Sequence, residues 1–110
     1  MTNINHGLSQ RSLNTLYGIF SKYGAVNRVI LYGSRAMGTY KNGSDIDITL
    51  DVGEGFTESD LLRVCGDLDE SDLPYFVDCS ILSEIGNQEL REHVARVGKV
   101  LYERTGQNRL

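Results

Sequence analysis

Two aspartates separated by one residue are the most informative feature of the sequence, because they are carboxylates in a segment that reads as a β-strand. The segment at residues 45–50 (DIDITL) alternates strictly between polar and apolar residues. Side chains two residues apart share one face of a strand, so Asp45 and Asp47 are expected to lie together. Neighbouring carboxylates repel each other unless a cation lies between them. Since Mg²⁺ prefers carboxylate oxygens together with phosphates and water, the pair predicts a magnesium site.

A third aspartate, Asp78, lies in the middle of an apolar run at residues 75–82 (YFVDCSIL). An acid in such a run is costly unless it is paired or binds a metal. If this run is a strand beside residues 45–50, three carboxylates converge and can hold two Mg²⁺ ions for in-line attack on phosphorus. Simpler interpretations remain: Asp45 and Asp47 as a solvated strand face, and Asp78 as an acid satisfied by arginine or backbone N–H groups.

The dipeptide Gly33-Ser34 follows another apolar run and precedes a possible short helix. Glycine lets a phosphate approach the backbone, and free N–H groups with the Ser34 hydroxyl can bind phosphate oxygens. Alone, such a dipeptide is usually only a turn. Its significance comes from the pair of acids that follows ten residues later.

The other chemically active side chains give weaker signals. Arg35 and Lys41 are interpreted as surface charges that lie close enough to reach a triphosphate. His6 and His93 show no metal-ligand spacing, and His93 is expected to flank the apolar stripe of the last helix.

The elements that must position these residues alternate between helix and strand. Apolar spacing predicts helices over residues 9–23, 57–71 and 87–97, with a short helix over 35–40. Gly24 and Gly98 are expected to end the first and last of them. Strands are predicted over residues 26–31, 45–50 and 75–82, with a short edge strand over 99–103. This order predicts an α/β (α+β) fold, a two-layer domain in which helices pack on a small mixed β-sheet.

Length and charge narrow the range of partners. The 110 residues are expected to form a single domain, residues 1–110. The net charge of −4 and the lack of a Lys or Arg run disfavour a long nucleic acid, whereas a triphosphate bound through metal ions remains compatible. No apolar stretch approaches a membrane span, and no secretory signal is visible, so a cytoplasmic location is expected. Cys65 and Cys79 are expected to be buried, reduced thiols.

The combined pattern resembles the minimal (MNT) branch of the DNA polymerase β-type nucleotidyltransferase superfamily. The resemblance rests on a hydrophobic-Gly-Ser tripeptide, ten intervening residues, an Asp-x-Asp motif and a later strand acid, here YGS at 32–34, DID at 45–47 and Asp78. It implies a polymerase β-like palm fold. It also implies that Gly33 and Ser34 bind the triphosphate of ATP and that Asp45 and Asp47 bridge two Mg²⁺ ions. Asp78 would bind one ion and help deprotonate the attacking hydroxyl.

Within that branch, the chain is similar to the antitoxins of HEPN–MNT toxin–antitoxin pairs. This similarity implies transfer of AMP from ATP to a hydroxyl of a small all-helical HEPN partner encoded nearby, within a hetero-oligomer. One alternative is nucleotidyl transfer to a small molecule such as an aminoglycoside, with a helical substrate-binding partner. Another is a non-catalytic antitoxin that neutralises its partner by binding alone.

Overall fold

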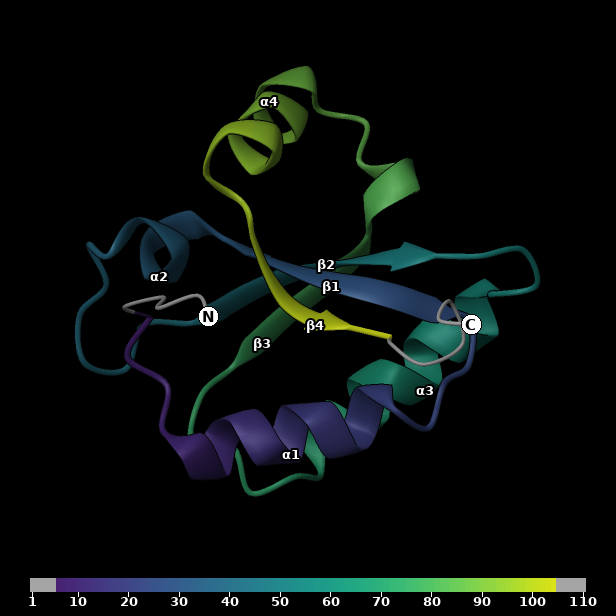
Figure 1. Ribbon diagram of the computed structural model, residues 1–110, viewed down its shortest axis with the longest axis horizontal. Helices are drawn as coiled ribbons and strands as arrows, with labels where there is room; N and C mark the ends of the chain where they lie inside the picture. The colour runs from purple at the N-terminus through teal and green to yellow at the C-terminus, as the bar shows by residue number, and fades with distance from the viewer. Residues whose placement is uncertain (1–5, 105–110) are drawn as a thin grey trace.

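The computed structural model describes residues 6–104 of the chain (Figure 1). Along the chain, the helices and strands are α1 (Gln10–Phe20), β1 (Val26–Tyr32), α2 (Gly33–Met37), β2 (Ile46–Val52), α3 (Glu58–Asp69), β3 (Val77–Ile81), the 3₁₀ turn η1 (Leu82–Glu84), α4 (Gln88–Val97) and β4 (Lys99–Glu103). The predicted order of elements is therefore confirmed. The 3₁₀ turn was not predicted.

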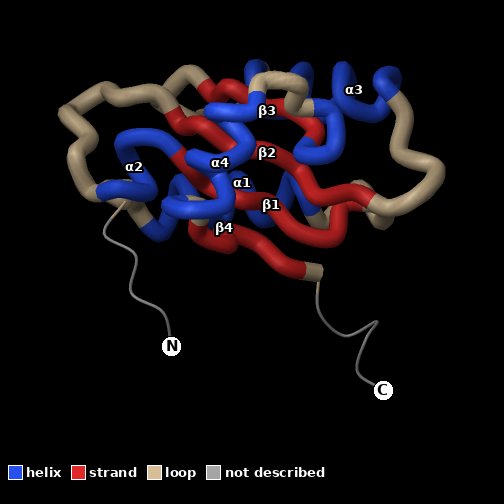
Figure 2. Tube along the Cα trace, turned by 90° about the horizontal axis from the view of Figure 1, so that it is seen from above, coloured by secondary structure: helices blue, strands red, loops and turns tan. Residues whose placement is uncertain are grey.

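The four strands form one mixed sheet in the order β3-β2-β1-β4 (Figure 2). β1 pairs antiparallel with both β2 and β4, whereas β2 pairs parallel with β3. A parallel neighbour needs a crossover connection, and α3 forms it between β2 and β3. The small mixed sheet is as predicted, and the strand of Asp78 lies beside the strand of Asp47.

Helices cover both faces of this sheet, so the expectation of two layers is wrong (Figure 1). α1 and α3 lie against one face, and α4 lies against the other. The larger core cluster fills the α1 and α3 side and contains Leu8, Leu16, Ile19, Phe20, Val26, Val29, Leu31, Ile46, Ile48, Leu50, Val64, Leu68 and Leu101. The third layer is needed because Ile30 and Tyr32 point to the opposite face from Val29 and Leu31 and are also buried.

The smaller cluster, on the α4 side, consists of Ile30, Tyr32, Ile85 and Val94. It holds α4 on the face that also carries the side chains of Asp47 and Asp78. The position of the site therefore depends on this second, smaller core.

Helix ends follow local capping chemistry with one correction. Thr57 and Asp60 form a reciprocal capping box at the start of α3, as the sequence indicates. α1 ends at Phe20 with Ser21 as its cap, so Gly24 does not end the helix. After Phe20 the chain forms i→i+3 hydrogen bonds, from Lys22 N to Ile19 O and from Tyr23 N to Phe20 O. The α-helix therefore ends before Gly24.

Two further expectations can be compared with the structure. Gly98 follows the last residue of α4, as predicted. Cys65 and Cys79 are free thiols, but both are half-buried rather than fully buried. Within residues 6–104, no helix combines the length and the apolar character that crossing a lipid bilayer would require.

Candidate functional site

Three neighbouring strands bring Tyr32, Asp47 and Asp78 into one row across the sheet. The Cα partners of Asp47 are Tyr32 on β1 and Asp78 on β3. Directly opposed residues on neighbouring strands present their side chains to the same face. That face is the one on which α4 packs, because Tyr32 belongs to the α4 cluster. The structure therefore sets two of the predicted acids side by side, although they lie 31 positions apart in the sequence.

Asp45 lies just outside the regular strand, because β2 begins at Ile46. It is exposed, as is Asp78, whereas Asp47 between them is half-buried. The charge of Asp45 nevertheless acts on the Asp47 carboxyl. The three acids thus form one electrostatic group, in which Asp47 is the most enclosed member.

The pKa of Asp47 is raised above its ordinary value of 3.8. Burial is the largest cause, and the negative charges of Asp78 and Asp45 add to it. Like charges that cannot separate disfavour ionisation. A cation placed among these carboxylates would remove the repulsion, so the group has the electrostatics of a cation site.

The donor set fits Mg²⁺ that arrives with a phosphate ligand better than a metal held by protein atoms alone. Carboxylate oxygens are hard donors that suit Mg²⁺. Within residues 6–104, however, no three His, Cys, Asp or Glu side chains are arranged as a ready-made metal cage. Mg²⁺ usually takes one or two carboxylates and completes its shell with substrate phosphates and water. Asp45, Asp47 and Asp78 could hold Mg²⁺ in that way.

The turn at Gly33 is built around the Asp47 carboxylate. Gly33 has a φ of +74°, in the left-handed region that favours glycine. A Cβ atom added there would collide with the carboxylate of Asp47. The glycine of the Gly-Ser dipeptide is therefore required twice, once by its backbone conformation and once by the acid beside it.

His93 of α4 reaches this turn and occupies one of the backbone groups that the sequence analysis expected to be free. The Gly33 N–H donates to His93 Nε2 at 3.1 Å. The imidazole also meets the Tyr32 ring edge-on, with the ring centroids 6.1 Å apart. Sequence reasoning missed this role. A signal was present, because His93 lies three residues after Leu90 and four before Val97, on the inward stripe of the helix.

Arg35 is a core residue, and its interpretation as a surface charge is wrong. Its exposed fraction is 2%. The guanidinium donates to the Ser44 carbonyl from Nε at 3.1 Å and from Nη2 at 2.9 Å, and to the His6 carbonyl at 2.7 Å. It also lies between the rings of Tyr40 and Tyr75, 5.0 and 4.5 Å from their centroids. Arg35 therefore anchors the loop that leads to Asp45, whereas Lys41 is exposed as expected.

Tyr32 places an uncharged aromatic side chain at one end of the row. Burial raises the pKa of its hydroxyl, and the charges of Asp78 and Asp47 raise it further. The hydroxyl therefore keeps its proton at neutral pH. Two residues further along β2 and β3, on the same face, the Ser80 hydroxyl donates to Thr49 Oγ1 at 2.9 Å. These polar side chains next to the acids therefore bond with each other.

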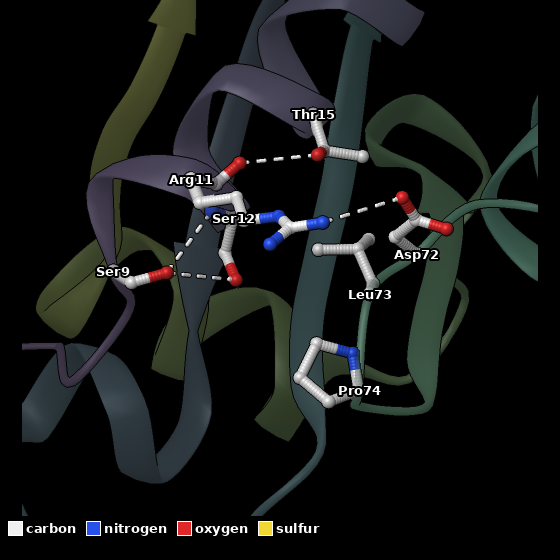
Figure 3. A pocket seen from close by; sticks show the side chains of 7 residues that line it. All are labelled: Ser9, Arg11, Ser12, Thr15, Asp72, Leu73 and Pro74. Atoms are coloured by element: carbon white, nitrogen blue, oxygen red, sulfur yellow. Dashed lines mark hydrogen bonds and ion pairs between the residues drawn. The ribbon is translucent and has the colours of Figure 1, made fainter.

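A hollow of about 300 Å³ at the start of α1 lies away from these residues (Figure 3). It is lined by Ser9, Arg11, Ser12, Thr15, Asp72, Leu73 and Pro74. Its hydroxyls are engaged locally: Ser9 Oγ donates to Ser12 Oγ at 3.2 Å, and Thr15 Oγ1 donates to the Arg11 carbonyl at 3.0 Å. Since it contains none of the acids, the row of carboxylates remains the candidate site.

Comparisons with known proteins agree with the fold and with the motif. The family model "Polymerase beta, Nucleotidyltransferase" matches residues 14–107, a range that includes Gly33, Ser34 and all three acids. A comparison with curated proteins finds no significant match.

Two solved structures illustrate the likeness of fold. A crystal structure of a toxin–antitoxin with AMP-PNP is 23% identical with a TM-score of 0.67, and the alignment covers 84% of this chain and 74% of that one. A mutant of the toxin–antitoxin MntA-HpeT is 19% identical with a TM-score of 0.64, covering 89% and 75% respectively. At these identities the likeness establishes the arrangement of the elements.

Proposed function

The chain belongs to the polymerase beta nucleotidyltransferase family, and from this premise we propose that it transfers AMP from ATP to a hydroxyl group of a partner protein in the presence of Mg²⁺. The observation that carries the proposal is the register that sets Asp47 beside Asp78, next to the Gly33 turn. Nucleotidyl transfer needs carboxylates close together, to hold the metal ions and to take the proton from the acceptor hydroxyl. The chain supplies it from two strands and one turn.

Each site residue has a role in this proposal. Asp45 and Asp47 would hold both Mg²⁺ ions, and Asp78 would hold one of them. When bound, the ions supply positive charge that neutralises the triphosphate and activates its α-phosphorus. Gly33 and Ser34 hold the triphosphate. The Gly33 N–H is already bonded to His93, so Gly33 contributes by having no side chain, which lets a phosphate approach the backbone.

Asp78 faces the acceptor, since it is exposed on the edge strand β3. Its carboxylate takes the proton from the attacking hydroxyl. The hydroxyl oxygen then bonds to the α-phosphorus, and the bond from that phosphorus to pyrophosphate breaks. The products are an AMP ester of the acceptor and free pyrophosphate.

The proposed acceptor is a small all-helical protein of the HEPN type, and the chain would act as its antitoxin. Two observations support this. Two of the three acids, Asp45 and Asp78, are open to solvent and can admit a macromolecular acceptor. Two solved structures of similar fold are described as toxin–antitoxin structures, one of them with the ATP analogue AMP-PNP.

The direct test is to incubate the chain with its neighbouring gene product and ATP labelled at the α-phosphate, with and without Mg²⁺. Label is expected on the partner only when Mg²⁺ is present, and ATP labelled at the γ-phosphate should leave the partner unlabelled. Asp47→Asn should reduce labelling by about a hundred- to a thousandfold, since it removes a group that acts on the transition-state charge.

A matched control is Asp51→Asn. Asp51 lies on the same strand and is engaged by Arg28 Nε at 2.9 Å, away from the row. Its removal should leave labelling unchanged within about twofold. Absence of label with the folded parent chain would contradict the proposal. If Asp45→Ala with Asp47→Ala still neutralised the partner in full, neutralisation by binding alone would replace it.

A further inference from the structure

His93 contributes to the candidate site from an element that carries none of the predicted site residues. It lies on α4, whose Val94 is buried in the smaller core together with Tyr32. From there it makes two contacts at the end of β1: the edge-on contact with the Tyr32 ring and the hydrogen bond from the Gly33 N–H. Sixty residues separate the two partners of that bond. His93 thus ties α4 directly to the glycine turn.

The bond satisfies a backbone group that the short helix α2 cannot satisfy itself. Gly33 is the first residue of α2, and the first N–H groups of a helix lack acceptors within the helix. A capping side chain on the preceding residue bonds the second or third N–H of a helix and not the first, and Tyr32 makes no cap bond at all. The acceptor for the Gly33 N–H is His93 Nε2. Since Nε2 is the acceptor, the imidazole proton in this arrangement lies on Nδ1.

Gly33 is therefore restrained from two sides. On one side, the Asp47 carboxylate occupies the position that a Cβ of Gly33 would take, so the turn packs directly against that carboxyl group. On the other side, the N–H is fixed by His93. Together these contacts determine how the turn faces the row of acids.

We propose that His93 is a positioning residue of this site, which holds the left-handed turn at Gly33 against the Asp47 carboxylate by accepting the Gly33 N–H. The proposal deepens the proposed function, because it rests on this turn being the one that receives the triphosphate. His93 acts through Gly33 and needs no contact with the nucleotide. Its contribution should therefore appear in nucleotide affinity and in the behaviour of one backbone amide.

Two substitutions separate the hydrogen bond from the packing. His93→Phe keeps an aromatic ring against Tyr32 but has no acceptor, whereas His93→Gln has an amide oxygen that can accept the Gly33 N–H. In the full chain labelled with ¹⁵N, exchange of the Gly33 amide with D₂O should be slow in the parent and in His93→Gln. It should be at least about tenfold faster in His93→Phe, because the amide is then left without a partner.

The same three proteins are then titrated with ATP and Mg²⁺ by calorimetry. His93→Phe is expected to weaken binding by roughly tenfold, and His93→Gln by no more than about threefold, because the glutamine restores the acceptor. A merely structural role of the ring would give the reverse order, with phenylalanine the milder change.

Equal amide exchange in the parent and in His93→Phe would overturn the proposal, and so would an equal loss of affinity in both variants. If the parent chain bound no ATP, the proposed function would fail instead. The exchange rates would then still decide separately whether His93 holds the turn. The two failures are therefore distinguishable.

Discussion

At the scale of single residues, Asp47 combines the requirements of folding and of chemistry in one carboxyl group. It lies between Tyr32 and Asp78 on the sheet and fills the space beside Gly33. Its burial and its acidic neighbours raise its pKa, which means that its ionised form is disfavoured in the folded chain. A residue that binds a cation must nevertheless be ionised, so stability and function oppose each other here.

Asp47→Asn is therefore expected to stabilise the chain when divalent ions are excluded. Because the folded-state pKa of Asp47 is raised, its favourable contribution is full below its ordinary pKa of 3.8 and is lost as the pH rises through the raised value. An asparagine stays neutral throughout. Urea unfolding between about pH 4 and about pH 7 should show the advantage of the variant growing with pH.

Added Mg²⁺ gives the matching control. It should raise the unfolding midpoint of the parent more than that of Asp47→Asn, since a ligand stabilises only the chain that binds it. Parallel pH profiles of stability for parent and variant would show that ionisation of the Asp47 carboxyl does not destabilise the folded chain.

Gly33→Ala is expected to abolish nucleotidyl transfer. The substitution places a Cβ on the Asp47 carboxylate and forces a side chain into a left-handed conformation. Gly38→Ala is the matched control, because Gly38 has a φ of +79° and an added Cβ there meets nothing within 4 Å. Both variants should lose about 1–2 kcal/mol of unfolding free energy from backbone strain. Only Gly33→Ala should lose labelling activity, and equal activity in both would contradict this account of the turn.

At the scale of elements, the loop between α2 and β2 is held by the buried guanidinium of Arg35. Arg35 donates to the carbonyls of Ser44 and His6 and stacks between two tyrosine rings. Ser44 directly precedes Asp45, so the same bonds that satisfy the guanidinium also fix the start of the acidic motif. A loop is positioned here by the core of the domain.

Arg35→Lys should destabilise the chain by about 2–3 kcal/mol. A lysine keeps the charge but loses the planar fork that bonds two carbonyls and the flat surface that stacks on Tyr40 and Tyr75. Chemical denaturation measures the loss. Arg63→Lys is the control, because the Arg63 side chain is 67% exposed and pairs with Asp60 on the surface. That change should stay within about 0.5 kcal/mol, and a similarly small effect at Arg35 would contradict the anchoring role.

At the scale of the whole molecule, the two faces of the sheet are stabilised unequally. Among residues 6–104, thirteen buried residues form the core beneath α1 and α3, whereas four form the cluster beneath α4. Local stability follows the amount of apolar contact. The helix that carries His93 is therefore attached less firmly than the helices on the other face.

Native-state hydrogen exchange should show α4 opening at a lower free energy than β1 and β2. Val94→Ala should lower the opening energy of α4 with little effect on the strands. Leu50→Ala, which removes a fully buried side chain of the larger core, should lower global stability by about 2–5 kcal/mol. Uniform protection across all elements would show instead that the molecule unfolds as one unit.

Much of the fold could be predicted from the sequence, because alternation and helical spacing are properties of adjacent residues. The strand of Asp47, the strand of Asp78 and the capping box at Thr57 all follow from local patterns that the structure confirms. The face shared by Asp47 and Asp78 also followed once the two strands were taken as neighbours. Helix ends were less certain, since α1 ends before Gly24.

The elements and the family motif can be predicted from the sequence, because each is encoded within a few consecutive positions. Three features appear only in the folded chain: α4 packs on the face of the acids, His93 bonds the Gly33 amide and Arg35 is buried. Each of these contacts joins residues far apart in the sequence, and their separation follows neither the helical nor the strand period. They depend on how the layers stack on the sheet, and that is set by the sum of many apolar contacts distributed over the whole chain.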